Sequence, residues 1–143
     1  METPDLDLRI AADPVEVPRL LDLLEGYAEA AGIGPLAAHR LAVVCEELAA
    51  NVAEHGTAAT PGGGASYVAV ALRRRGPALH LVVEDDGPPF DPLGHAVPDT
   101  TAPLEARGAG GLGVHLVRTL ARDLRYERWG ALNRLSLVLD AEA

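Results

Sequence analysis

Hydrophobic residues change their spacing along the chain, and each change marks a new predicted element. Residues 5–10 alternate between polar and apolar positions, which predicts a short strand. Residues 14–31 instead carry leucines at helical spacing, between Asp13 in a helix-capping position and Gly32 as a C-terminal stop. This second segment is therefore predicted to be a helix.

A second helix and a hairpin follow in the pattern. The helix is predicted from Pro35 to about Glu54, with Gly56 ending it. Residues 65–75 and 78–85 both have strand character, and the latter contains the near-continuous apolar run ALHLVV. The glycine and proline between the two segments predict a turn.

From residue 86 onward, the sequence predicts a loop, a helix and a second hairpin. Residues 86–107 hold five prolines and no periodicity, which predicts a long loop that is either a functional lid or disordered. A helix is predicted over 111–122, and a hairpin over 124–140 that turns near 130–133. The order β-α-α-β-β-α-β-β predicts one domain over 5–140: a two-layer α/β sandwich whose mixed or mostly antiparallel sheet carries helices on one face.

Composition narrows the functions that fit this fold. The 143 residues carry a net charge of −9, which argues against a nucleic-acid-binding surface. Cys45 is the single cysteine, so neither a disulfide framework nor a cysteine-based zinc site is available. The N-terminal sequence METPDLDLRI has no signal-peptide character, and no apolar run approaches a membrane span. We expect a cytoplasmic protein that binds neither nucleic acid nor membrane.

A glycine-rich stretch, RGAGGLGVHLV at 107–117, precedes the third predicted helix. Gly108, Gly110 and Gly113 match the spacing G-x-G-x-x-G of dinucleotide-binding turns. That motif requires a strand directly before it and an acidic residue about 20 positions later, but DTTAPLEAR precedes it and residues 130–133 lie where the acidic residue is expected. Two interpretations remain open: a hinge before a helix, or backbone N–H groups that bind an anion at a helix N-terminus.

Two further patches carry polar residues suited to chemistry. Glu47, Asn51 and Glu54 are spaced to share one face of the second helix, which is either a solvated face or a base and an Mg²⁺ ligand. Asp85 ends the apolar strand just before Gly87. It is either a turn former or a pocket carboxylate that accepts a hydrogen bond from an exocyclic amine, with the glycine admitting a flat ring.

The helix motif E-x-x-x-N, the strand motif D-x-G and the glycine-rich helix start, in this order, resemble the GHKL ATPase superfamily. The resemblance covers 5–140 and implies the Bergerat ATP-binding fold with ATP and Mg²⁺ as cofactors. In EELAAN it implies Glu47 as general base and Asn51 as Mg²⁺ ligand, whereas the rival Glu46 lies five residues before Asn51. It also implies that Asp85 reads adenine, with Gly87 beside the base.

The same resemblance assigns the phosphates to the glycine-rich stretch. Gly108, Gly110, Gly111 and Gly113 would cradle them, with Leu112 inside the GLGV motif. The chain contains no lysine, so Arg107 is the nearest candidate cation for the terminal phosphate.

Among GHKL proteins, the short chain and the sequence NVAEHG are most similar to stand-alone anti-sigma-factor serine/threonine kinases. That branch implies phosphorylation of a STAS-type anti-anti-sigma partner, binding of a sigma factor, or both, and it is compatible with a homodimer. In DDGPPFDP, Pro89 stands where the family often has a second glycine. The alternatives are therefore a catalytically weak nucleotide-binding module that acts through protein binding, or an α/β domain with a solvated Glu/Asn face.

Overall fold

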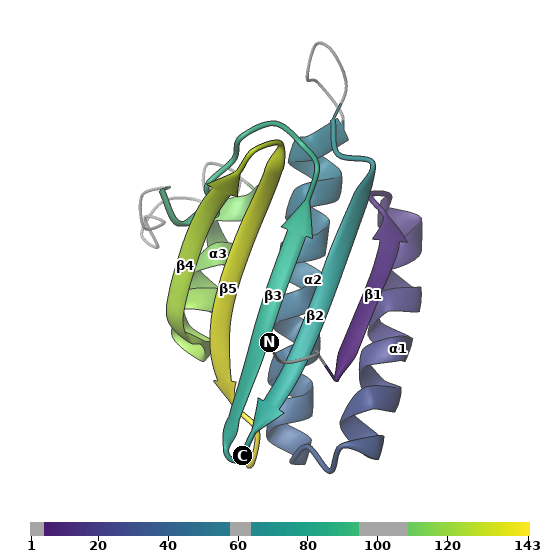
Figure 1. The fold of residues 1–143 in the computed structure, drawn as a ribbon, viewed down its shortest axis with the longest axis vertical. Coiled ribbons are helices and arrows are strands. Elements are labelled where there is room, and N and C mark those ends of the chain that lie inside the picture. Colours follow the sequence, from purple (N-terminus) through teal and green to yellow (C-terminus); the bar gives the residue numbers. More distant parts are fainter. Residues whose placement is uncertain (1–4, 58–63, 95–108) are drawn as a thin grey trace.

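One antiparallel sheet forms the front layer of the computed structural model, which describes residues 5–57, 64–94 and 109–143 (Figure 1). The strand order is β1-β2-β3-β5-β4, and every neighbouring pair is antiparallel. The strands are β1 (Leu6–Ala11), β2 (Tyr67–Arg75), β3 (Ala78–Asp85), β4 (Arg122–Trp129) and β5 (Leu132–Asp140).

The helices cover one face of this sheet and leave the other face open (Figure 1). They are the 3-10 turn η1 (Pro14–Glu16), α1 (Val17–Ala30), α2 (Pro35–Thr57), the 3-10 turn η2 (Pro92–Gly94) and α3 (Ala109–Leu120). The predicted two-layer α/β fold with helices on one face is therefore confirmed, and the sheet is fully antiparallel. A dinucleotide-binding unit has neighbouring parallel strands, whereas all described neighbouring strands here pair antiparallel.

The helix ends follow the predicted signals with small shifts. Asp13 accepts a hydrogen bond from the Val15 backbone N–H at 3.0 Å, and Gly32 adopts φ +66° behind α1. The predicted start at residue 14 is a 3-10 turn, so α1 itself begins at Val17. The second helix runs through Gly56 to Thr57, so the prediction that this glycine ends it is wrong.

The third helix lies two residues earlier than predicted, from Ala109 to Leu120, because β4 already begins at Arg122. Asp123 adopts φ +55°, and the pairing of β4 with β5 shifts register between Arg122 and Arg125. The last hairpin turns at Gly130, with φ +56°, as the glycine there predicts.

Leucine, valine and alanine fill the layer between sheet and helices, as the low aromatic content predicts. The largest fully buried side chains there include Leu41 of α2, Leu81 of β3 and Leu137 of β5. Along β3 burial alternates strictly, and its last residue, Asp85, falls on the buried side. The strand pattern thus directs a carboxylate toward the helices rather than toward solvent.

Three elements meet at one end of the molecule, which is the upper end in Figure 1. The C-terminal end of β3, the C-terminal part of α2 and the first turn of α3 all lie there. Each of the three motifs from the sequence analysis maps to one of these places. Among the described helices, none is both long and apolar enough to cross a membrane.

Candidate functional site

A small cavity lies between α2 and the inner face of the sheet, at the C-terminal end of β3. Asn51 of α2 and Asp85 of β3 both line it. Most other wall residues are apolar or aromatic, and they come from α2, the central strands and the segment after β3: Leu48, Val52, Val83, Phe90, Pro92, Tyr126 and Leu135. Two polar residues from separate motifs therefore share one largely apolar cavity, which is the usual composition of a small-molecule site.

The polar face of α2 is only partly solvated. Asn51 is 6% exposed and belongs to the buried side of the helix, so the solvated-face interpretation is wrong for this residue. Glu47, one turn earlier, is half-buried and lies outside the cavity wall, whereas Glu46 and Glu54 are exposed. Partial burial, followed by the charge of Glu46, raises the pKa of Glu47. A higher pKa makes this carboxylate a better proton acceptor than a fully solvated one.

Asp85 is 9% exposed, and its Oδ1 atom accepts two hydrogen bonds. The Gly87 backbone N–H donates one at 2.8 Å and the Asn133 side-chain amide donates the other at 3.0 Å. Desolvation nevertheless raises the pKa of Asp85 above its ordinary value. The residue therefore serves the turn and the cavity at once, and its Oδ2 atom takes part in neither bond.

Asn133 of β5, which the sequence analysis did not single out, organises this end of the sheet. Its amide N–H groups donate to Asp85 and to the Pro88 carbonyl at 2.8 Å, and its Oδ1 atom accepts from the Phe90 backbone N–H at 3.2 Å. It is 5% exposed and pairs directly with Asp85 in the sheet. The sequence contains a signal for it, because Asn133 occupies the apolar phase of the alternating strand LNRLSLVLD.

Two β4 residues extend the network around Asn133. The Tyr126 hydroxyl donates to Asn133 Oδ1 at 2.6 Å, and Arg128 donates to the same atom at 3.1 Å and to the Gly87 carbonyl at 2.8 Å. Together with Asn133 they fix the DGPPF segment from its β4–β5 side. A second glycine is therefore not needed to shape this loop, and Pro89 is accommodated as an exposed residue.

The structure gives a steric reason for glycine at position 87, beside the predicted approach of a ring. A Cβ atom there would lie 2.9 Å from Asp85 Oδ1 and 3.2 Å from the Ala65 Cβ atom. A side chain at this position would push directly on the carboxylate. The adjacent Asp86 anchors the loop elsewhere: its Oδ1 accepts the backbone N–H groups of Ser66 at 2.6 Å and Tyr67 at 3.2 Å.

The glycine-rich motif is only partly described. Gly110, Gly111, Leu112 and Gly113 lie in the first turns of α3, whereas Arg107 and Gly108 fall outside the described residues. Farther along α3, Arg118 donates a hydrogen bond to the Leu93 carbonyl. This contact joins α3 to the segment that supplies Phe90 and Pro92 to the cavity wall.

The arrangement suits a planar heterocycle that carries an amine. The aliphatic and aromatic side chains of the wall would pack against the ring, and the Asp85 carboxylate would accept the amine N–H. The Asn51 amide supplies a neutral oxygen of the kind that Mg²⁺ accepts, and this ion usually takes few protein ligands beside substrate phosphates. Both groups therefore fit an adenine nucleotide with its magnesium ion.

Comparison with known proteins bears on the fold and the family of the chain. No curated protein matches the chain significantly. Among solved structures, the chain is similar to "The crystal structure of the RsbU and RsbW domains of Rv1364c from Mycobacterium tuberculosis", with a TM-score of 0.60 and 18% identity. The likeness covers 97% of this chain and 33% of the other chain, so this chain spans about a third of the length of that solved structure.

The structural likeness supports the fold, and a family match supports the assignment of the chain. The sequence model described as "Histidine kinase-like ATPase domain" matches residues 10–139, which is most of the sequence. The protein belongs to the histidine kinase-like ATPase family.

Proposed function

We propose that this protein binds ATP with Mg²⁺ in the cavity between α2 and the sheet, and transfers phosphate to serine or threonine on a partner protein. The observation that carries the proposal is that Asn51 and Asp85, both buried, line the same cavity. Family membership supports ATP as the nucleotide. Charge neutralisation on the phosphates is the chemistry that bound Mg²⁺ supplies.

Asp85 is the proposed adenine-reading residue. Asn133 and Gly87 hold its Oδ1 atom, so the carboxylate is fixed before a ligand arrives. Preorganised acceptors bind more tightly because less side-chain freedom is lost on binding. The Oδ2 atom then accepts the exocyclic amine, with Gly87 beside the ring.

Asn51 is the proposed Mg²⁺ ligand and Glu47 the proposed general base. The half-buried Glu47 lies one helical turn from Asn51, so a hydroxyl that approaches the phosphate end of the site would meet it. Gly108, Gly110, Gly111, Leu112 and Gly113, with Arg107, are the proposed phosphate-binding segment. The glycines at 110–113 lie at the N-terminal end of α3, and the N-terminal end of a helix favours anions.

The proposed protein partners are a STAS-domain anti-anti-sigma factor as phosphate acceptor and a sigma factor as a bound target. The likeness to a structure whose title names RsbU and RsbW domains supports this choice. The second candidate is a regulatory module that binds nucleotide and partner without transfer. Pro89 favours it, because proline offers no backbone N–H group where the family often has a glycine, even though the loop itself is held in place by Asn133 and Arg128. We also propose a single domain over 5–140, a cytoplasmic location and a capacity to form homodimers.

The adenine assignment predicts opposite effects for two neighbouring aspartates. Because desolvation raises the pKa of Asp85, its ionised form opposes folding at pH 7, so Asp85→Asn should keep or raise the Tm. The same variant should weaken ATP binding at least about tenfold, since an amide N–H group would face the adenine amine. Calorimetric titration with ATP and thermal melts measure the two effects.

Asp86→Asn is the matched control for that prediction. Desolvation raises the pKa of Asp86, but the hydrogen bonds from Ser66 and Tyr67 outweigh it and leave the pKa lowered. Its ionised form therefore stabilises the fold at pH 7, and this contribution is lost as the pH falls through the folded-state pKa. Asp86→Asn should lower the Tm and keep ATP affinity. Unchanged affinity in Asp85→Asn would remove the adenine role.

The metal assignment predicts that Asn51→Ala removes the dependence of ATP affinity on Mg²⁺. In the original protein, adding Mg²⁺ should tighten ATP binding by about tenfold, because the amide oxygen completes the ion's shell. In the variant the affinities with and without Mg²⁺ should agree within about twofold. Glu54→Ala, on the exposed side of α2, should retain the full Mg²⁺ effect. If Asn51→Ala keeps the Mg²⁺ effect, Asn51 is not the Mg²⁺ ligand and another residue must hold the ion.

The kinase assignment predicts that Glu47→Gln binds ATP normally and transfers phosphate at least about a hundredfold more slowly. The assay incubates each protein with γ-labelled ATP and a STAS-domain protein from the same organism. Glu46→Gln, at the adjacent exposed position, should slow transfer far less than Glu47→Gln, because it removes only the smaller of the two causes that raise the pKa of Glu47. Equal loss in both variants would exclude Glu47 as the specific base. Partner binding without any label, even in the original protein, would favour the regulatory module.

A further inference from the structure

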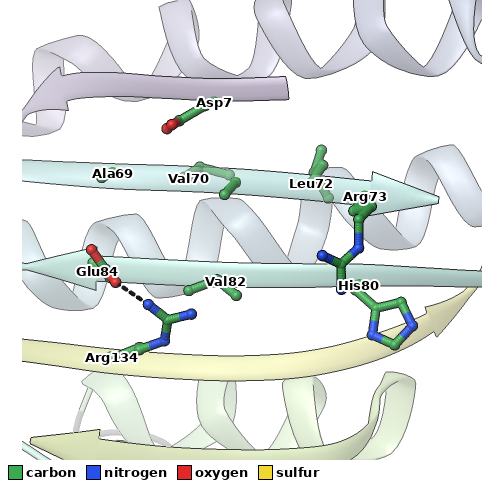
Figure 2. Close-up of a pocket in the computed structure, with 10 residues that line it drawn as sticks. Asp7, Ala69, Val70, Leu72, Arg73, His80, Val82, Glu84 and Arg134 are labelled. Carbon is green, nitrogen blue, oxygen red and sulfur yellow. Dashed lines mark hydrogen bonds and ion pairs between the residues drawn. The ribbon is translucent and has the colours of Figure 1, made fainter. Parts of the chain in front are cut away.

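The sheet face that no helix covers carries the larger of the two cavities that we describe. This cavity has a volume of about 310 Å³ and lies over β1, β2, β3 and β5. Figure 2 shows Arg73 with His80 at one end of it and the Glu84–Arg134 pair at the other. The nucleotide cavity lies on the opposite side of the same sheet, so the two sites are separate.

The pairing register places the residues of this open face in rows that cross the strands. One row consists of Arg73, His80, Val138 and Arg122, paired in that order from β2 to β4. We call its three basic members the basic row. The next row runs from Asp7 of β1 through Ala71, Val82 and Ser136 to Arg125 of β4, and its three middle members have small or short side chains. We call these three middle members the trough, because long side chains flank them and the cavity lies over Ala71 and Val82.

Charge is distributed unevenly between this face and the rest of the chain. Among the residues that the structure describes, six arginines point outward from the open face: Arg9, Arg73, Arg75, Arg122, Arg125 and Arg134. Four acidic residues of the described strands do so: Asp7, Glu84, Glu127 and Asp140. A protein with a net charge of −9 thus has one face on which cations exceed anions.

Aromatic contacts hold two of these arginines in place. The Arg9 guanidinium lies 3.8 Å from the centre of the Tyr67 ring, and that of Arg134 lies 4.5 Å from the centre of the Trp129 ring. Arg134 is also paired with Glu84 at 2.5 Å. Fixed cations lose less conformational freedom when a partner binds. The face is therefore organised in the free protein.

We propose that the open sheet face is a docking surface for an acidic segment of a partner protein. The segment would lie in the trough, across the strands, with its carboxylates against Arg73, His80 and Arg122 of the basic row. Charge complementarity supports this choice, since the basic row has no acidic member. The side chains of the trough beside it are short, so they leave room for a peptide. A nucleic acid fits less well, because a long polyanion would also meet the four carboxylates of this face, which a short acidic segment beside the basic row can avoid.

The test titrates acetylated octaglutamate into the ¹⁵N-labelled chain in 150 mM salt and follows backbone amide shifts by NMR. We expect shifts concentrated at Ala71, Val82 and Ser136 and in the basic row, with ATP affinity unaffected. The double variant Arg73→Ala/Arg122→Ala should bind the peptide at least tenfold more weakly. Arg19→Ala/Arg40→Ala, which removes the same charge from the helical layer, should bind it as the original protein does.

A second variant separates charge from shape. Ala71→Trp fills the trough without altering charge and should also weaken octaglutamate binding at least tenfold, while its ATP affinity shows that the fold and the nucleotide cavity persist. Failure of octaglutamate to bind, shifts confined to other surfaces, or equal losses in both double variants would overturn the proposal. Tighter binding of a single-stranded octanucleotide than of octaglutamate would also overturn it. The same holds if the original protein self-associates in the ultracentrifuge and Ala71→Trp abolishes that self-association.

Discussion

The hydrogen bond between Asn133 and Asp85 is the contact on which the candidate site depends. It joins the central strand to its neighbour where the sheet ends, and it places a carboxylate inside a largely apolar wall. Burying such a group is costly unless its oxygens are hydrogen-bonded. Asn133 and Gly87 meet part of that cost, and the raised pKa of Asp85 shows the part that remains. A ligand amine at the second oxygen would relieve it further, which is a physical reason for the site to bind.

The two faces of the sheet have different chemistry because strand residues alternate between them. On β3 the inward residues end in Asp85, whereas the outward residues include His80, Val82 and Glu84. The inward side is apolar and closed by helices, so it suits a small molecule. The outward side is charged and uncovered, so it suits a macromolecule. One sheet can therefore hold a nucleotide and a partner without direct competition between them.

Much of the fold could be predicted because local spacing fixes the elements. The period-two pattern gave both hairpins, and Asp13 and Gly32 marked the first helix within a few residues. The ends of α2 at Thr57 and of α3 at Leu120 were less predictable. A glycine lowers helix stability without always ending a helix, and the start of β4 depends on pairing with β5.

The site was predictable only where its residues belong to short motifs. Asn51 and Asp85 were found in this way, but spacing alone could not show that Asn51 is buried. Asn133, Arg128 and Tyr126 were missed because their roles depend on β5 lying beside β3, which a single sequence does not specify. A polar residue in the apolar phase of a strand, as at Asn133, is the signal that such a partner exists.

The most direct test of this account follows the side-chain amide of Asn133 by NMR while ATP and Mg²⁺ are added. Because this amide donates to Asp85 and to the Pro88 carbonyl, its protons should exchange slowly with solvent in the free protein. They should also shift with the same affinity that calorimetry reports for ATP. If the Asn133 amide signals stay fixed while ATP binds and shifts other residues, the nucleotide occupies a different site and the account is contradicted.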